Sequence, residues 1–171
     1  MADKILIFLL ILMSVFCSGY SEDIIALSVD RLEKFFSSSF PVRQGVYYTK
    51  VPRGLIISVD ENLFFNDCNY ELKDGAYYIL DEFADLLKTL PNFCVIENHV
   101  QKEPCGLENW ELSMMRSSSI AEYLVKEKNV PSEKIFDIGF GETMPFRDNV
   151  APKDGLDNRV DFVIIEYEAK R

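Results

Sequence analysis

The sequence lacks most of the residue patterns on which catalytic and metal-binding sites depend. It contains one histidine, no CxxC pair and no His–Cys spacing of the kind that binds zinc. No Ser–His–Asp order stands out, and the short "GFGE" segment ends a predicted strand without opening a helix, unlike a phosphate-binding loop. We therefore expect no enzyme activity, no cofactor and no metal site.

Positive charge is also scarce. The 171 residues include 18 Lys and Arg against 28 Asp and Glu, for a net charge of -10. Such a chain repels polyanions, so nucleic acid is not an expected partner. With 48% hydrophobic residues and no internal repeat, the chain is long enough for one globular domain with its own core.

The apolar run at the N-terminus is shorter than the roughly 20 residues that span a bilayer. Lys4 precedes this run (5–16), and small residues follow it, which is the layout of a secretory signal. We expect residues 1–21 to direct export to the periplasm or cell envelope. The alternatives are an uncleaved anchor, which would be the one contact with the inner or outer membrane, and lipidation at Cys17.

An exported protein meets an oxidising environment, in which its remaining cysteines can form disulfides. Cys68, Cys94 and Cys105 would stay in the mature chain. Cys94 opens an apolar run and is expected to be a buried free thiol. Cys68 and Cys105 both lie in predicted loops, and we expect a disulfide between them.

Hydrophobic periodicity divides the chain into a short N-terminal extension (22–52) and a main domain (53–171). The extension holds a predicted helix at 23–36 and a candidate strand at 46–51. The main domain is predicted to contain strands at 54–60, 93–99, 134–141 and 159–167 and helices at 72–90 and 109–129. This alternation predicts a sheet covered by helices, with parallel pairing across at least the first crossover and with ligand-binding loops after the first two strands.

Arg116 interrupts the apolar face of the predicted helix 109–129, although cations usually occupy the opposite face. Its planar guanidinium could hold a carboxylate in a bidentate pair, near a helix amino terminus that favours anions. The alternatives are a structural clamp with Glu97, Glu108 or Asp67, or a side chain that reaches out to solvent.

Four segments resemble, in order, the landmarks of the OmpA-like (OmpA/Pal/MotB) peptidoglycan-binding domain. They are "GLIISVDENLFFNDCNYELKDGA", "ENH" followed by "NWELSMMR", "EYLVKEKNVPSEKIFDIGFGETMP" and "DNRVDFVI". Asn109, Leu112 and Arg116 fall on positions similar to the family's Asn-x-x-Leu-Ser-x-x-Arg motif. The resemblance implies an α+β or α/β fold in the order β-α-β-α-β-β, with helices packed on a mixed sheet.

The resemblance also implies a ligand. In that family the domain binds peptidoglycan without catalysis: its arginine receives the carboxylate of the diamino acid in the stem peptide, and an aspartate after the second strand receives the ammonium group. Arg116 matches this arginine, but Gln101 stands in place of the aspartate, and an amide carries no charge. Asn66 and Asp67 complete the expected peptidoglycan-binding residues. Glu97, Glu103 or Asp67 could replace the missing charge.

Two functions follow as expectations. The first is an exported, non-catalytic protein that ties an envelope component to peptidoglycan. The second is a scaffold or interaction subunit of an envelope or flagellar-motor complex, with weakened or lost wall binding and with residues 22–52 as its docking element. His99, Phe64, Phe65 and Trp110 are expected to be structural, in the core or the wall of a pocket.

Overall fold

The computed structural model describes residues 28–39, 45–101, 106–145 and 156–166. The expected export signal (1–21) lies outside these ranges, as do Glu103 and Cys105. Within the described part of the chain, no helix combines the length and apolar character that crossing a bilayer requires.

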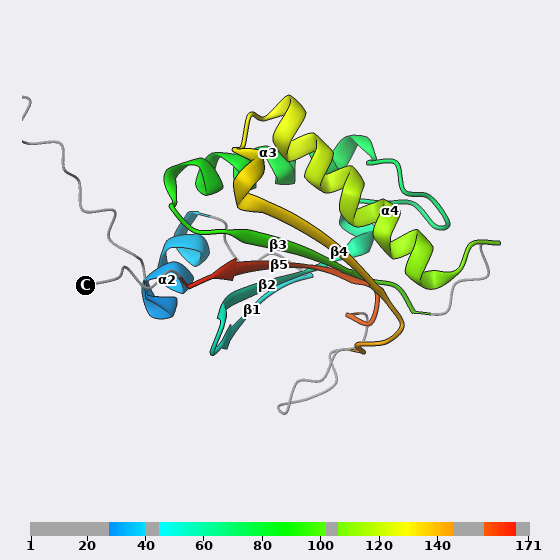
Figure 1. The fold of residues 1–171 in the computed structure, drawn as a ribbon, viewed down its shortest axis with the longest axis horizontal. Coiled ribbons are helices and arrows are strands. Elements are labelled where there is room, and N and C mark those ends of the chain that lie inside the picture. The colour runs from blue at the N-terminus through cyan, green and yellow to red at the C-terminus, as the bar shows by residue number, and fades with distance from the viewer. Residues whose placement is uncertain (1–27, 40–44, 102–105, 146–155, 167–171) are drawn as a thin grey trace, which may run out of the picture.

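Helices alternate with strands in the middle of the chain, and two consecutive strands lie on either side of this part (Figure 1). The elements are α2 (Val29–Ser39), β1 (Val46–Val51), β2 (Gly54–Asp60), the 3-10 turn η1 (Glu61–Leu63), α3 (Asp74–Thr89), β3 (Cys94–His99), α4 (Asn109–Glu122), the π turn η2 (Tyr123–Glu127), the 3-10 turn η3 (Ser132–Lys134), β4 (Ile135–Gly141) and β5 (Arg159–Ile165). The predicted strands match these bounds to within two residues. The long helix at 109–129 ends in the π turn, followed by Asn129 in the left-handed conformation (φ 56°), which asparagine tolerates.

The five strands form one mixed sheet in the order β1-β2-β5-β3-β4. β5 pairs antiparallel with both β2 and β3, and β3 pairs parallel with β4. The prediction of parallel pairing across the first crossover is wrong, because β5 returns between β2 and β3 and takes the hydrogen bonds of both. β2 and β3 nevertheless run in the same direction, so their carboxyl ends lie at the same edge of the sheet.

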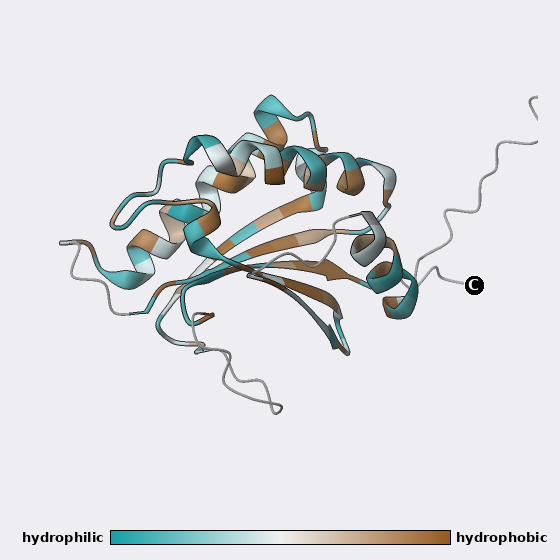
Figure 2. Cartoon of the chain, turned by 180° about the vertical axis from the view of Figure 1, so that it is seen from behind, coloured by the Kyte–Doolittle hydropathy of each residue, from teal (hydrophilic) through white to brown (hydrophobic). Residues whose placement is uncertain are grey.

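The helices α3 and α4 cover one face of the sheet (Figure 1), and apolar residues line the layer between them (Figure 2). The buried positions of α3 recur at the spacing of one helix face; they are Ala76, Leu80, Phe83, Ala84 and Leu87. The ring of Phe83 lies 4.3 Å from that of Phe162 on β5, measured between centroids. This contact joins the helix layer to the middle strand of the sheet.

Helix α2 packs into the same core. Leu32 and Phe36 are completely buried, and the ring centroids of Phe36 and Phe83 lie 5.7 Å apart. β1 adds an antiparallel strand to β2, and Lys50 on β1 pairs with Glu33 of α2 at 2.9 Å. The apolar side of α2 therefore contributes to the core of this chain.

Two glycines on β4 explain how closely α4 approaches the sheet. A Cβ atom at Gly139 would lie 2.3 Å from the backbone nitrogen of Met114, and one at Gly141 would lie 2.8 Å from that of Trp110. Any side chain at either position would clash with the helix backbone. The "GFG" segment thus serves helix packing.

Candidate functional site

The carboxyl ends of β2 and β3 meet at one residue of β5. Asp60, the last residue of β2, and His99, the last residue of β3, both pair with Arg159. The loops that follow these strands are therefore neighbours, as the sequence predicts.

Asn158 connects these two loops. Its backbone carbonyl accepts a hydrogen bond from the N–H of Glu61 (3.4 Å), and its side-chain oxygen accepts one from the N–H of Gln101 (2.6 Å). Glu61 and Gln101 are thus held on either side of the start of β5.

Arg116 lies inside the helix layer, next to the loop after β2. Its Nη1 donates to Oε1 of Glu61 at 2.9 Å, its Nε donates to the carbonyl of Asn69 at 2.8 Å, and its Nη2 donates to the carbonyl of Asn66 at 3.3 Å. The guanidinium carbon also lies 5.3 Å from the centroid of the Phe65 ring, within the range of a cation–π contact. The side chain thus ties α4 to the first loop.

The carboxylate that pairs with Arg116 is Glu61. The structural clamp that the sequence allowed is thus made with Glu61, which was not among the expected partners Glu97, Glu108 and Asp67. Glu61 follows β2 directly and begins the η1 turn, which brings its side chain under α4. In the sequence it resembles a solvated loop acid, because nothing in its spacing distinguishes it from Asp60 or Asp67.

The Arg116–Glu61 pair is almost completely buried. The two side chains are 1% and 4% exposed. A buried ion pair is costly to break, because removal of one partner leaves an uncompensated charge in a low-dielectric surrounding. In this arrangement the guanidinium faces a carboxylate of its own chain.

Gln101 lies at the start of the loop after β3 and is half-buried. Its backbone is held by Asn158, and among the described residues its side-chain Nε2 has no hydrogen-bond acceptor. No described hydrogen bond joins it to Arg116.

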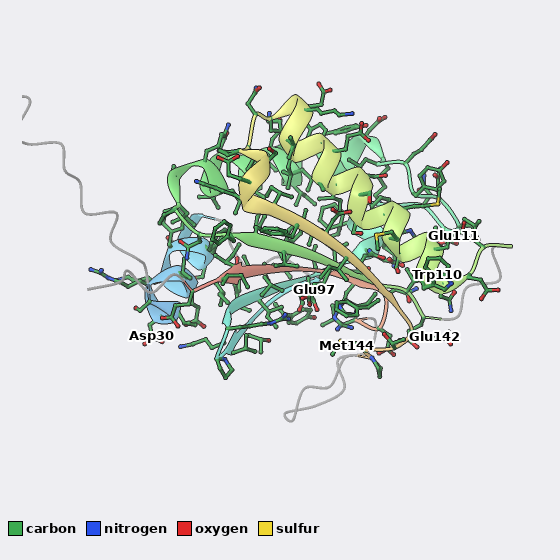
Figure 3. The ribbon with its side chains drawn as sticks, viewed as in Figure 1. Asp30, Glu97, Trp110, Glu111, Glu142 and Met144 are labelled. Carbon is green, nitrogen blue, oxygen red and sulfur yellow. The ribbon has the colours of Figure 1, made fainter. Side chains whose placement is uncertain are left out.

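The other residues of the predicted site serve different surfaces. Asn109 is the first residue of α4, one position after the N-cap residue Glu108, and its amide nitrogen donates to Oε2 of Glu142 at 2.6 Å. Leu112 is buried in the core. Trp110 was predicted as core or pocket wall, but it is 62% exposed. It lies near Glu142, at the amino-terminal end of α4 (Figure 3).

The loop after β2 is exposed at its tip. Asn66 contributes its backbone carbonyl to Arg116, and Asp67 is exposed. Cys68 is disulfide-bonded, and Cys94 is a buried free thiol, as predicted. The predicted partner Cys105 lies outside the described residues, so the Cys68–Cys105 pairing stays a prediction.

A second group of charged residues occupies the face of the sheet away from α3 and α4. It lines a hollow of about 680 Å³, and Figure 3 shows Glu97 on this side. Arg53 donates from Nη1 and Nη2 to the two carboxylate oxygens of Glu97 at 2.9 and 3.0 Å. On the neighbouring strand, Nε of Arg159 donates to Oδ2 of Asp161 at 2.9 Å.

His99 lies on the same face of the sheet, and we call Arg53, Glu97, His99, Arg159 and Asp161 the open-face group. Its Nε2 lies 3.2 Å from Oδ2 of Asp161, and its ring stacks on Phe140 at 5.2 Å between centroids with an interplanar angle of 9°. Burial opposes the ionisation of Asp161, but the approach of His99 and the charge of Arg159 outweigh it and hold the pKa of this carboxyl below its usual range.

A model of the OmpA family matches residues 64–159. The chain belongs to the OmpA family. It is also 29% identical over 117 residues to the uncharacterized protein YtxE of Bacillus subtilis, a match that covers 66% of this chain and 48% of that protein. The chain thus spans about half the length of this curated relative.

Solved structures share the fold. The cell wall anchor of the T6SS from Pseudomonas aeruginosa superposes with a TM-score of 0.67 at 18% identity, covering 82% of this chain and 100% of the anchor. The periplasmic domain of Helicobacter pylori MotB gives a TM-score of 0.63 at 17% identity and covers 71% and 82% of the two chains. The predicted mixed sheet with packed helices is confirmed.

Proposed function

We propose that this chain is a non-catalytic protein of the cell envelope that works as an anchoring or interaction subunit, with weakened binding of peptidoglycan stem peptides. The observation that carries the proposal is the buried contact of 2.9 Å between Arg116 and Glu61. Glu61 occupies the place on the guanidinium that the diamino-acid carboxylate of a stem peptide would take.

A stem-peptide carboxylate would compete with the carboxylate of Glu61 for Arg116. A ligand carboxylate must first displace Glu61, and breaking a buried ion pair costs on the order of 3–5 kcal/mol. That cost corresponds to a loss of roughly 10²- to 10⁴-fold in affinity relative to an arginine that faces an open pocket. Gln101 adds to the deficit, because its amide cannot neutralise the ammonium group of a zwitterionic ligand.

The cellular setting of the proposal is the periplasm or another exported location. The disulfide at Cys68 supports export, since structural disulfides persist in oxidising compartments. The fold shared with a cell wall anchor and with a periplasmic MotB domain supports a role in an envelope or flagellar-motor assembly.

A second candidate is full-strength wall binding, in which Glu61 swings away and Arg116 holds the stem peptide together with Asn109 and the two loops. Membership of the OmpA family favours this candidate. So does the location of Arg116 beside the carbonyls of Asn66 and Asn69, at the edge of the sheet where the loops meet.

Co-sedimentation with purified sacculi separates the two candidates. We expect the wild-type chain to pellet weakly and Gln101→Asp to pellet more, because the new carboxylate supplies the missing charge for the ammonium group. Trp110→Ala is the matched control, because it changes an exposed residue at the amino-terminal end of α4 and leaves the Arg116–Glu61 pair intact. Strong pelleting of the wild type that is lost in Arg116→Lys, with circular dichroism unchanged, would favour the second candidate instead.

A thermal measurement tests the role of Glu61 directly. Glu61→Gln should lower the melting temperature, since it leaves the buried Arg116 without a carboxylate. A soluble stem peptide should then raise the melting temperature of this variant more than that of the wild type, because the ligand carboxylate replaces the missing one. Equal shifts in both proteins would show that Glu61 does not compete with the ligand.

A further inference from the structure

The open face of the sheet holds two acidic residues directly opposite each other. Glu97 on β3 pairs in register with Asp161 on β5, and their side chains are 5% and 6% exposed. Like charges at directly opposed positions of an antiparallel pair destabilise a sheet. Their presence here requires cationic neighbours, which Arg53 and Arg159 supply.

The arginines leave polar atoms of this group unused. Among the described residues, neither ring nitrogen of His99 has a hydrogen-bond partner, although His99 is more than nine-tenths buried. Nε2 of His99 is close to Oδ2 of Asp161 (3.2 Å), but the contact lacks the direction of a hydrogen bond. Two ligands bound about 2.1 Å from one metal ion lie about 3.0–3.4 Å apart, which matches this spacing.

We propose that Glu97, His99 and Asp161 form a binding site for a divalent transition metal ion on the open face of the sheet. One ligand atom from each residue lies within 4.8 Å of the others. One imidazole nitrogen with two carboxylate oxygens is a ligand set for Zn²⁺ and its neighbours. All three residues line the hollow of about 680 Å³, so the remaining coordination position would face that space.

The two arginines have different roles in this site. Arg159 is 6% exposed and holds Oδ2 of Asp161, which fits an outer partner that orients a ligating carboxylate. Arg53 is 51% exposed and spans both oxygens of Glu97, so it competes directly with a metal ion for that carboxylate. Because its side chain already reaches solvent, it can withdraw and keep its charge hydrated.

The competition gives the proposal a distinctive test. The full chain, oxidised and stripped of metal, is titrated with Zn²⁺ by calorimetry, and Co²⁺ absorption reports the coordination. We expect one bound ion per chain and about a tenfold tighter dissociation constant in Arg53→Ala, since a change of about 1.4 kcal/mol is tenfold. Lys50→Ala is the matched control, because Lys50 is another half-exposed cation (47%) of the β1–β2 hairpin that pairs with acids elsewhere.

Three further variants complete the experiment. Glu97→Gln, His99→Gln and Asp161→Asn should each weaken Zn²⁺ binding at least about tenfold, with folding checked by circular dichroism. Absence of Zn²⁺ binding in both the wild type and Arg53→Ala would overturn the proposal. Equal affinities in Arg53→Ala and Lys50→Ala would also overturn it, even if the buried variants fail to fold. The result is independent of peptidoglycan binding, so the two proposals can fail separately.

Discussion

Two of the arginine–carboxylate pairs among the described residues lie on opposite faces of the sheet, and they differ in what surrounds them. The Arg116–Glu61 pair lies under α4, with both partners nearly inaccessible (1% and 4% exposed). The Arg53–Glu97 pair faces a hollow, with the arginine half-exposed and the glutamate buried. The same two functional groups therefore meet in a sealed site and in an open one.

This difference determines what each pair can do. In the sealed site both charges depend on each other, and a ligand must break the pair before it can bind. In the open site Arg53 stays hydrated when it withdraws, and the hollow admits water or another cation to the carboxylate of Glu97. The exposure of one partner, more than the types of residue, therefore decides whether an ion pair is structural or can exchange a partner.

The largest expected effect is on the sealed pair. Arg116→Ala should lower the free energy of unfolding by about 3–5 kcal/mol, because Glu61 would be left as a buried unpaired carboxylate. Urea unfolding followed by circular dichroism measures the change. The double variant Arg116→Met/Glu61→Met serves as the control and should lose less. A loss below about 1 kcal/mol in Arg116→Ala would show that the site is not sealed in solution.

An intermediate effect is expected at Asp161, where the comparison can be sharpened by pH. Asp161→Asn should cost about 1.5–3 kcal/mol near neutral pH, since it weakens charged hydrogen bonds. The native pKa of Asp161 lies below its usual value, and the unfolded value is about 3.9. The carboxylate therefore stabilises the fold fully well above pH 4, and this contribution disappears as pH falls through the native pKa.

Unfolding of wild type and Asp161→Asn at several pH values between about 3 and 7 checks this expectation. The difference in stability between the two proteins should narrow as pH falls below about 4. A difference that stays constant over the whole range would mean that the ionisation of Asp161 does not stabilise the fold.

The smallest effect is expected at the exposed end of the open pair. Arg53→Ala should change stability by about 1 kcal/mol or less, because solvent screens a half-exposed guanidinium and because Glu97 lines the hollow, so water can reach the carboxylate once Arg53 is truncated. The difference should shrink further as salt is raised. Thermal unfolding at low and high ionic strength measures it. A loss comparable to that of Arg116→Ala would remove the distinction between the two systems.

Much of the fold could be predicted from local pattern. The strand at 54–60 and the helix of α3 follow from apolar periodicity, and Gly, Asp and Pro mark their limits. The order of the strands in the sheet could not be predicted in this way, because β5 enters between β2 and β3 from a distant part of the chain. Which strands pair depends on the insertion of β5, and a short stretch of sequence carries no information about it.

The candidate sites show the same division. The position of Arg116 on an apolar helix face predicted an inward guanidinium, and the structure agrees. Its partner Glu61 was missed, because a strand-end acid looks solvated until α4 packs over it. The open-face group was missed as well, since Asp161 is far from Glu97 and His99 in sequence and joins them through strand register. The exposure of Trp110 was also not predictable from its helical spacing.

The sequence by itself determined the acidic charge, the positions of most helices and strands, and the placement of a cation on an inward helix face. These properties depend on composition and on short-range periodicity. The tertiary structure alone decided which carboxylate meets which arginine and which of these pairs reaches solvent. Burial and charge pairing arise from segments that become neighbours only when the sheet closes around β5.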